Sequence, residues 1–85
     1  MKVLIPSALR SYTGASQVPG AGDSLHGVLA DLDRRFPGIR FRIVDERGLL
    51  RPNLRLFVDG LGVRDLDHPV RDARVVAIVL ALSGG

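Results

Sequence analysis

The sequence contains no cysteine among its 85 residues. A disulfide scaffold, a thiolate metal site and a cysteine nucleophile are therefore excluded, and so is an iron–sulfur cluster held by cysteines. The two histidines, His26 and His68, are too few for a metal site without a carboxylate cluster beside them. We therefore expect no bound metal or cofactor, and we assign structural roles to both histidines.

Long hydrophobic runs are also missing. The longest covers residues 75–82, far short of the roughly 20 residues that a membrane helix needs, and no signal-peptide pattern follows Met1. We therefore expect a cytoplasmic protein. Aromatic residues make up only 5% of the chain, so it offers few platforms on which the bases of single-stranded nucleic acid can stack.

The composition that remains is that of one small folded domain. Hydrophobic residues make up 46% and charged residues 25% of the chain, as in ordinary globular proteins. We predict a single domain over residues 1–85, which buries roughly 60–65% of the surface that its unfolded chain exposes. The net charge of +3 comes with arginines spread along the chain, and such a surface suits either nucleic acid or an acidic protein partner.

A helix over residues 25–36 is the clearest predicted element. Asp23 or Ser24 suits its N-cap, because either side chain accepts a hydrogen bond from a first-turn amide. Pro37 and Gly38 end it. The apolar residues between these signals recur at helical spacing and form one stripe: Leu25, Val28, Leu29, Leu32 and Phe36.

Five further segments read as strands, apart from a very short one at Val63, with a turn over residues 10–14. Residues 39–43 alternate strictly between apolar and arginine, the period of a half-buried strand. Residues 75–82 are apolar on both faces, which is typical of a central strand. The remaining strands are predicted at residues 2–9, 15–19 and 54–58, with a very short one beginning at Val63 after a tight Asp59-Gly60 turn. This order predicts an α+β protein of the β-grasp arrangement: a mixed four- to five-stranded sheet with one main helix.

We predict a flexible tail over residues 83–85, which have the sequence Ser83-Gly84-Gly85. A terminal carboxylate is a poor electrophile, so an enzyme must convert it to an acyl-adenylate with ATP before a nucleophile attacks it. Glycine has no Cβ and wide conformational freedom, so Gly84 and Gly85 can thread into a narrow active site where other residues would clash. Attack by a sulfur donor would then leave a thiocarboxylate on Gly85. The alternative is a frayed end of small residues.

Several motifs resemble those of the MoaD/ThiS-type sulfur carriers, which are ubiquitin-like proteins of prokaryotes. They are VLIPSALR at residues 3–10 with TG at 13–14, GDSL at 22–25, DHPV at 67–70 and SGG at 83–85. The resemblance covers essentially the whole chain and is strongest to the carriers that work with a cysteine synthase. The chain departs from the family pattern at two places. It has Asp72-Ala73-Arg74 where Asp-Gly-Asp is common, and Leu80-Ala81 where proline is common near the tail.

The resemblance implies a protein cosubstrate and not an enzyme. A ubiquitin-activating-like adenylyltransferase would use ATP and a sulfur donor to convert Gly85 to a thiocarboxylate. A second enzyme would then accept the sulfur, and the product would be cysteine, a thiolated cofactor or a thiolated natural product. Candidate acceptors are a cysteine synthase, a thiazole synthase or a similar biosynthetic enzyme. The resemblance implies neither a nucleic-acid nor a membrane partner.

One face of the predicted sheet carries a candidate docking patch for these partners. Its members are Leu4, Pro6, Phe57, Val63 and Val79. The alternative is ordinary packing, because scattered apolar residues are normal on protein surfaces.

Two other functions stay open. In the first, activated Gly85 forms an isopeptide bond with a lysine of another protein, which makes the chain a ubiquitin-like modifier. In the second, the chain is a non-covalent binding module that uses its basic surface, for instance for RNA. Removal of Gly85 would then change nothing, and binding would weaken steeply with salt.

Overall fold

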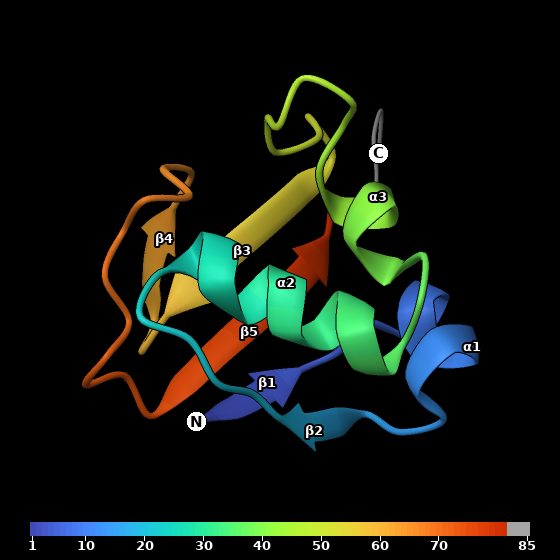
Figure 1. The fold of residues 1–85 in the computed structure, drawn as a ribbon, viewed down its shortest axis with the longest axis horizontal. Helices are drawn as coiled ribbons and strands as arrows, with labels where there is room; N and C mark the ends of the chain where they lie inside the picture. Colours follow the sequence, from blue (N-terminus) through green and yellow to red (C-terminus); the bar gives the residue numbers. More distant parts are fainter. Residues whose placement is uncertain (82–85) are drawn as a thin grey trace.

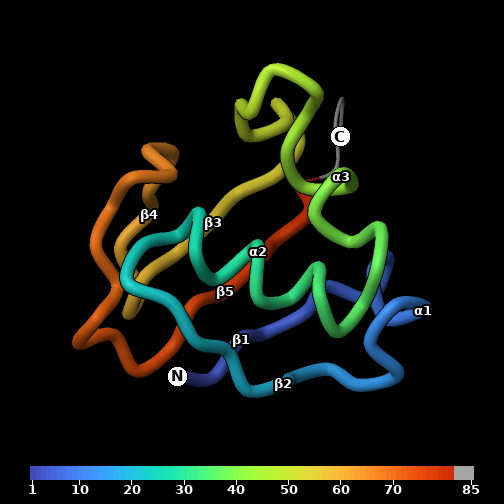
Figure 2. Tube along the Cα trace, in the orientation of Figure 1, coloured from blue at the N-terminus to red at the C-terminus, as the bar shows by residue number. Residues whose placement is uncertain are grey.

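A five-stranded mixed sheet forms the centre of the structure, a computed structural model that describes residues 1–81. Figures 1 and 2 show the longest helix lying across one face of this sheet. The strands are β1 (Lys2–Leu4), β2 (Gln17–Pro19), β3 (Leu54–Val58), β4 (Leu61–Val63) and β5 (Val75–Leu80). Their spatial order is β2-β1-β5-β3-β4. Strand β5 runs parallel to β1 and antiparallel to β3, so its predicted central place is confirmed.

The face of β5 under the helices belongs to the core, and the other face is partly open. Val76 and Ile78 are buried, whereas Val79 is 41% exposed. The expectation of burial on both faces is therefore wrong for the last part of this strand. The predicted strand also extended to residue 82, but β5 ends at Leu80, and residue 82 lies outside the described residues.

Helix α2 (Leu25–Arg35) is the main helix, as predicted, and crosses the sheet (Figure 1). The Ser24 hydroxyl accepts a hydrogen bond from the backbone N–H of Gly27 at 3.3 Å, which confirms the cap. The loop before the helix lies directly on its first turn. A Cβ built at Gly22 would stand 2.5 Å from the backbone nitrogen of Val28, so only glycine fits there.

Residues 39–43 form a short helix, α3 (Ile39–Ile43), and the predicted strand is wrong. Gly38 takes a left-handed conformation with φ 97°, which breaks the chain away from α2. The Asp33 carboxylate then accepts hydrogen bonds from the backbone N–H groups of Gly38 and Arg40, each at 3.1 Å. Ile39 and Ile43 are buried on one helical face and Phe41 is 55% exposed. Spacing of four places both isoleucines on one face of a helix as well as of a strand.

The first predicted strand also ends early. Strand β1 stops at Leu4, and the chain continues as a 3₁₀ turn (Ser7–Leu9) and a short helix, α1 (Arg10–Thr13). The predicted turn over residues 10–14 is therefore helical. Pro6 explains the stop, because proline has no N–H to donate to a sheet ladder. Among residues 1–81, no helix has the length and apolar character needed to cross a membrane.

A tight two-residue turn joins β3 to β4, as predicted. Asp59 and Gly60 both have positive φ, 49° and 88°, the combination of hairpin turns that match strand twist. The Asp59 carboxylate accepts hydrogen bonds from the backbone N–H groups of Arg74 and Val75, at 3.0 and 2.9 Å. This carboxylate therefore fastens the start of β5 to the end of β3.

Candidate functional site

The predicted site residues Ser83, Gly84 and Gly85 lie outside the described residues. The structure does place the root of the tail, which we define as Leu80 and Ala81. Leu80 is the last residue of β5 and pairs with Leu54. The backbone N–H of Ala81 donates to the carbonyl of Asn53 at 2.7 Å. The chain is thus held in the sheet up to the position where the last four residues begin.

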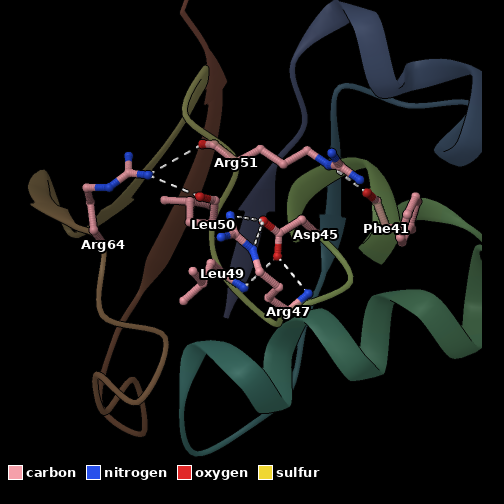
Figure 3. A network of polar contacts seen from close by, with 7 residues as sticks. All are labelled: Phe41, Asp45, Arg47, Leu49, Leu50, Arg51 and Arg64. Carbon is pink, nitrogen blue, oxygen red and sulfur yellow. Dashed lines mark hydrogen bonds and ion pairs between the residues drawn. The ribbon is translucent and has the colours of Figure 1, made fainter.

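The loop over residues 44–53 borders this root and is held by polar contacts (Figure 3). The Asp45 carboxylate accepts from the backbone N–H groups of Leu49, at 3.1 Å, and Arg47, at 2.9 Å. It also pairs with the Arg47 guanidinium at 3.0 Å. The Leu49 amide and these Arg47 contacts hold the pKa of Asp45 below its ordinary value. Arg64 closes the other side, donating to the carbonyls of Leu54 and Leu50 at 3.2 Å each.

Two hollows flank the root of the tail. The first, which we call the arginine pocket, has a volume of about 380 Å³. Its lining includes Phe41, Arg42, Arg51, Asn53, Leu54 and Leu80. The second, which we call the proline groove, has a volume of about 350 Å³. It is lined by Pro6, Ser7, Ala8, Ile78, Val79 and Leu80. Leu80 belongs to both hollows, so any molecule that surrounds the tail at its root meets both.

The strand register brings most of the predicted docking patch together on the open face, which is the sheet face opposite α2. Leu4 pairs with Ala77, Ala77 pairs with Phe57, and Phe57 pairs with Gly62, so these residues form one row across four strands. Leu4 is 37% exposed. In the next row Val79 pairs with Arg55. Pro6 joins the patch through the proline groove, where it lines the wall beside Val79.

Val63 does not belong to this patch. It pairs with Leu56, whose side chain is buried in the core, and Val63 itself packs against that core. The two-residue turn at Asp59 and Gly60 explains why Val63 lies on the core side. It pairs Val58 with Leu61, and this register sets the remaining pairs between β3 and β4. The sequence contained this signal, since the same turn was already predicted.

Sequence reasoning missed three parts of the site. Ala77 lies between Leu4 and Phe57, and the alternation of residues 75–79 would have placed it on the face of Val79. Arg42 and Arg51 line the arginine pocket, and nothing in the sequence marks them out among the other arginines. Their placement depends on α3, which the strand prediction for residues 39–43 hid.

The histidines contribute no metal site in the described part of the chain. Within residues 1–81, no group of three or more metal-ligating side chains gathers. The Nε2 atom of His26 lies 3.5 Å from a carboxylate oxygen of Asp67, and both side chains are largely open to solvent. This pair links the first turn of α2 to the loop before β5.

A mixed sheet crossed by one main helix, with its last strand in the centre, defines a ubiquitin-like β-grasp protein. The model of the ThiS family matches residues 3–85. The sulfur carrier protein CysO of Mycobacterium tuberculosis is 34% identical over 89 residues, which cover 98% of this chain and 96% of that protein. The chain therefore belongs to the ThiS family.

Solved structures agree with this assignment. The crystal structure of Mycobacterium tuberculosis CysO matches with a TM-score of 0.89 and 32% identity, over 95% of this chain and 98% of that one. In the crystal structure of the Amycolatopsis orientalis BexX/CysO complex, the matching chain gives a TM-score of 0.90 and 31% identity, over 99% and 98% of the two chains. The small archaeal modifier protein 1 of Methanosarcina acetivorans matches with a TM-score of 0.81 and 25% identity, over 99% and 94%.

These matches confirm the predicted family and the ubiquitin-like β-grasp fold. They also confirm the predicted class of function, that of a sulfur carrier. A protein of this class is a cosubstrate that other enzymes act on, and not a catalyst.

Proposed function

We propose that this chain carries sulfur as a thiocarboxylate on Gly85. The observation that supports the proposal is a terminal diglycine in a member of the ThiS family, closely following a central strand that is held to its last pair. Four residues follow Ala81. Extended, four residues reach about 13–14 Å. That length suits an active-site channel that takes in the tail and leaves the folded body outside.

The proposed chemistry has two steps. The Gly85 carboxylate attacks the α-phosphorus of ATP, pyrophosphate leaves, and an acyl-adenylate forms. A sulfide equivalent then attacks the carbonyl carbon, so that a carbon–sulfur bond forms and AMP leaves with the oxygen that linked it. Both steps take place in a partner, a ubiquitin-activating-like adenylyltransferase, which supplies the ATP site. The carrier itself supplies the carboxylate and the handle by which the partner holds it.

The open face of the sheet is the proposed handle. Leu4, Ala77, Phe57 and Val79 form a partly exposed apolar surface there, and the proline groove continues it to the root of the tail. An apolar centre of this kind is typical of the buried part of a protein interface. We propose that the adenylyltransferase and the sulfur-accepting enzyme both dock on this face.

We further propose that the acceptor belongs to cysteine biosynthesis and that the exchange takes place in the cytoplasm. The similarity to CysO supports the first point. The complex of CysO with BexX shows that such a carrier from another organism binds a protein partner. A cysteine synthase is therefore the first acceptor to test.

The likeness to a small archaeal modifier protein favours a second candidate function. In that case the activated Gly85 carbonyl would be attacked by a lysine amine of another protein, and an isopeptide bond would replace the bond to AMP. Both functions begin with the same adenylate, and the nucleophile distinguishes them.

Intact mass spectrometry tests the proposal. The chain is incubated with ATP, sulfide and the adenylyltransferase from the same organism, beside a variant that lacks Gly85. We expect a mass gain equal to the exchange of one oxygen for sulfur, in the full chain only. The proposal would be overturned if the full chain formed neither an adenylate nor a thiocarboxylate. Addition of a lysine-rich protein acceptor in place of sulfide tests the second function, which predicts a covalent conjugate.

A further inference from the structure

The arginine pocket stands beside the root of the tail and has a mixed lining. Leu54 and Leu80 supply apolar surface from the two paired strands, and Asn53 supplies the carbonyl that holds Ala81. Arg42 and Arg51 also line the pocket and bring two positively charged residues to it. A partner that takes in the tail must cover this pocket, because Leu80 forms part of its wall.

Arg51 is held in place before any partner arrives (Figure 3). Its Nε donates to the carbonyl of Phe41 at 2.8 Å, and its guanidinium lies 4.7 Å from the centre of the Phe41 ring. Hydrogen bonding and a cation–π contact thus fix the side chain, so little rotamer freedom remains to be lost on binding. Within residues 1–81, the two terminal nitrogens of Arg51 make no hydrogen bond, and they remain as donors.

No carboxylate of residues 1–81 neutralises the pocket. The ion pairs of this part of the chain use Asp23, Asp31, Asp45 and Asp67, and neither Arg42 nor Arg51 belongs to any of them. Two further arginines bind the backbone around the same end of β3. Arg55 donates to the carbonyl of Pro52 at 2.6 Å, and Arg64 donates to that of Leu54. Their positive charges add to those of the pocket.

Covering such a pocket with apolar surface would bury the positive charges of Arg42 and Arg51 without a carboxylate partner, which is strongly unfavourable. The molecule that covers it must therefore bring negative charge. A carboxylate suits a guanidinium because two parallel hydrogen bonds can form between them. The exposed Phe41 ring and the leucines suit an apolar side chain beside that carboxylate.

We propose that the arginine pocket receives an acidic side chain, aspartate or glutamate, from the rim of the channel that takes in the tail. The proposal rests on the proposed function and names a contact that the open face does not supply. The occupant is a protein and not a nucleic acid, because the pocket adjoins the tail and the chain offers few aromatic side chains for stacking bases. It follows that the channel entrance of the adenylyltransferase carries a carboxylate that pairs with Arg42 and Arg51.

The test compares steady-state kinetics of Arg42→Glu with those of Arg71→Glu, with the purified adenylyltransferase of the same organism as the probe. Both substitutions change the net charge equally. Arg71 is a matched control, since its side chain is 75% exposed and lies beside Asp23, and since it precedes the start of β5 whereas the root of the tail is at its end. We expect Arg42→Glu to raise the KM for the carrier about tenfold or more with kcat nearly unchanged, because charge repulsion weakens docking and leaves Gly85 intact. The effect should shrink at high ionic strength, and Arg71→Glu should change KM less than about twofold.

Arg51→Gln provides a second variant, and circular dichroism checks that each variant is folded. We expect Arg51→Gln to raise the KM for the carrier, as Arg42→Glu does. Equal KM values for all variants would overturn the inference, as would an equal rise with Arg71→Glu, which would reflect net charge alone. Binding of a labelled single-stranded RNA that is lost in Arg42→Glu would also overturn it. If the wild-type chain is not adenylated at all, the proposed function fails. If it is adenylated but the KM values do not differ as expected, only the inference about the arginine pocket fails.

Discussion

At the start of β5 the carboxylate of Asp59 is bound to the backbone, whereas at its end Arg42 and Arg51 line an open pocket. Asp59 uses its carboxylate to hold Arg74 and Val75. At the other end, Arg42 and Arg51 face a hollow of about 380 Å³. The first end thus uses charge to stabilise the fold, and the second keeps charge available to a partner. Substitution of Asp59 should therefore affect stability, and substitution of Arg42 or Arg51 should affect recognition.

The largest effect is expected at the end of β5, from deletion of Gly85. We expect a complete loss of adenylation and sulfuration, because the reacting carboxylate moves to Gly84 and no longer reaches the same depth in the channel. The thermal unfolding midpoint should stay unchanged. Intact mass and differential scanning calorimetry measure the two quantities. Sulfuration of the shortened chain at the wild-type rate would refute the assignment of Gly85.

The next effect is expected near the start of β5, where Gly22 lies on the first turn of α2. Gly22→Ala should lower the free energy of unfolding by about 1–3 kcal/mol, because the new Cβ meets backbone atoms that have no room to move. Urea unfolding measures this change. Gly62→Ala is the matched control, since its Cβ would make an ordinary contact at 3.5 Å with the Phe57 ring. Equal stability of the two variants would contradict the close packing described here.

A smaller effect is expected from Asp59→Ala. It removes the acceptor for two backbone N–H groups and places alanine at a positive φ, so we expect a loss of about 1–2 kcal/mol. Asp59→Asn should lose less, because asparagine tolerates this conformation and keeps an oxygen acceptor. Chemical denaturation of both variants checks the order. The adenylation kinetics of the folded variants should match those of the wild type. A tenfold rise in KM would contradict separate roles for the start and the end of β5.

The smallest effect concerns Asp45, in the loop beside the arginine pocket. Its hydrogen bonds with the Leu49 amide and Arg47 hold its pKa below the ordinary 3.8. A carboxyl with a lowered folded-state pKa stabilises the fold above its unfolded pKa and loses this contribution as the pH falls through the folded value. We therefore expect the stability of Asp45→Asn to depend less steeply on pH below about pH 4 than that of the wild type. Urea unfolding at several acidic pH values measures this. The same pH dependence in Asp45→Asn and in the wild type would contradict the stabilising role of this carboxylate.

The parts of the fold that local pattern determines were predictable. Helix α2 has an apolar stripe, a serine cap and a Pro-Gly stop, and these signals agree. Residues 39–43 gave the wrong element because isoleucines four apart share a face in both a helix and a strand. Asp33 and the left-handed Gly38 favour the helix over the strand, and both lie outside the segment.

The candidate site divides in the same way. The diglycine at residues 84–85 is visible in the sequence, and the family matches support the function that it predicted. Leu4 and Phe57, which lie in one row across the sheet with Ala77 between them, were grouped correctly by strand faces. Val63 was not, because its side of the sheet depends on the register of β4. The arginine pocket could not be predicted, since it requires α3, the loop over residues 44–53 and the end of β5 to meet in space.

The parallel pairing of β1 with β5 has a mechanical consequence. A partner that pulls on the tail loads β5 along its own axis, and β5 is paired with β1 on one side and with β3 on the other. These hydrogen bonds lie across the direction of the force, so they resist together instead of opening one by one. In the proposed complex the folded body would therefore stay at the entrance of the channel, and the number of residues after Ala81 would set how far Gly85 can enter it.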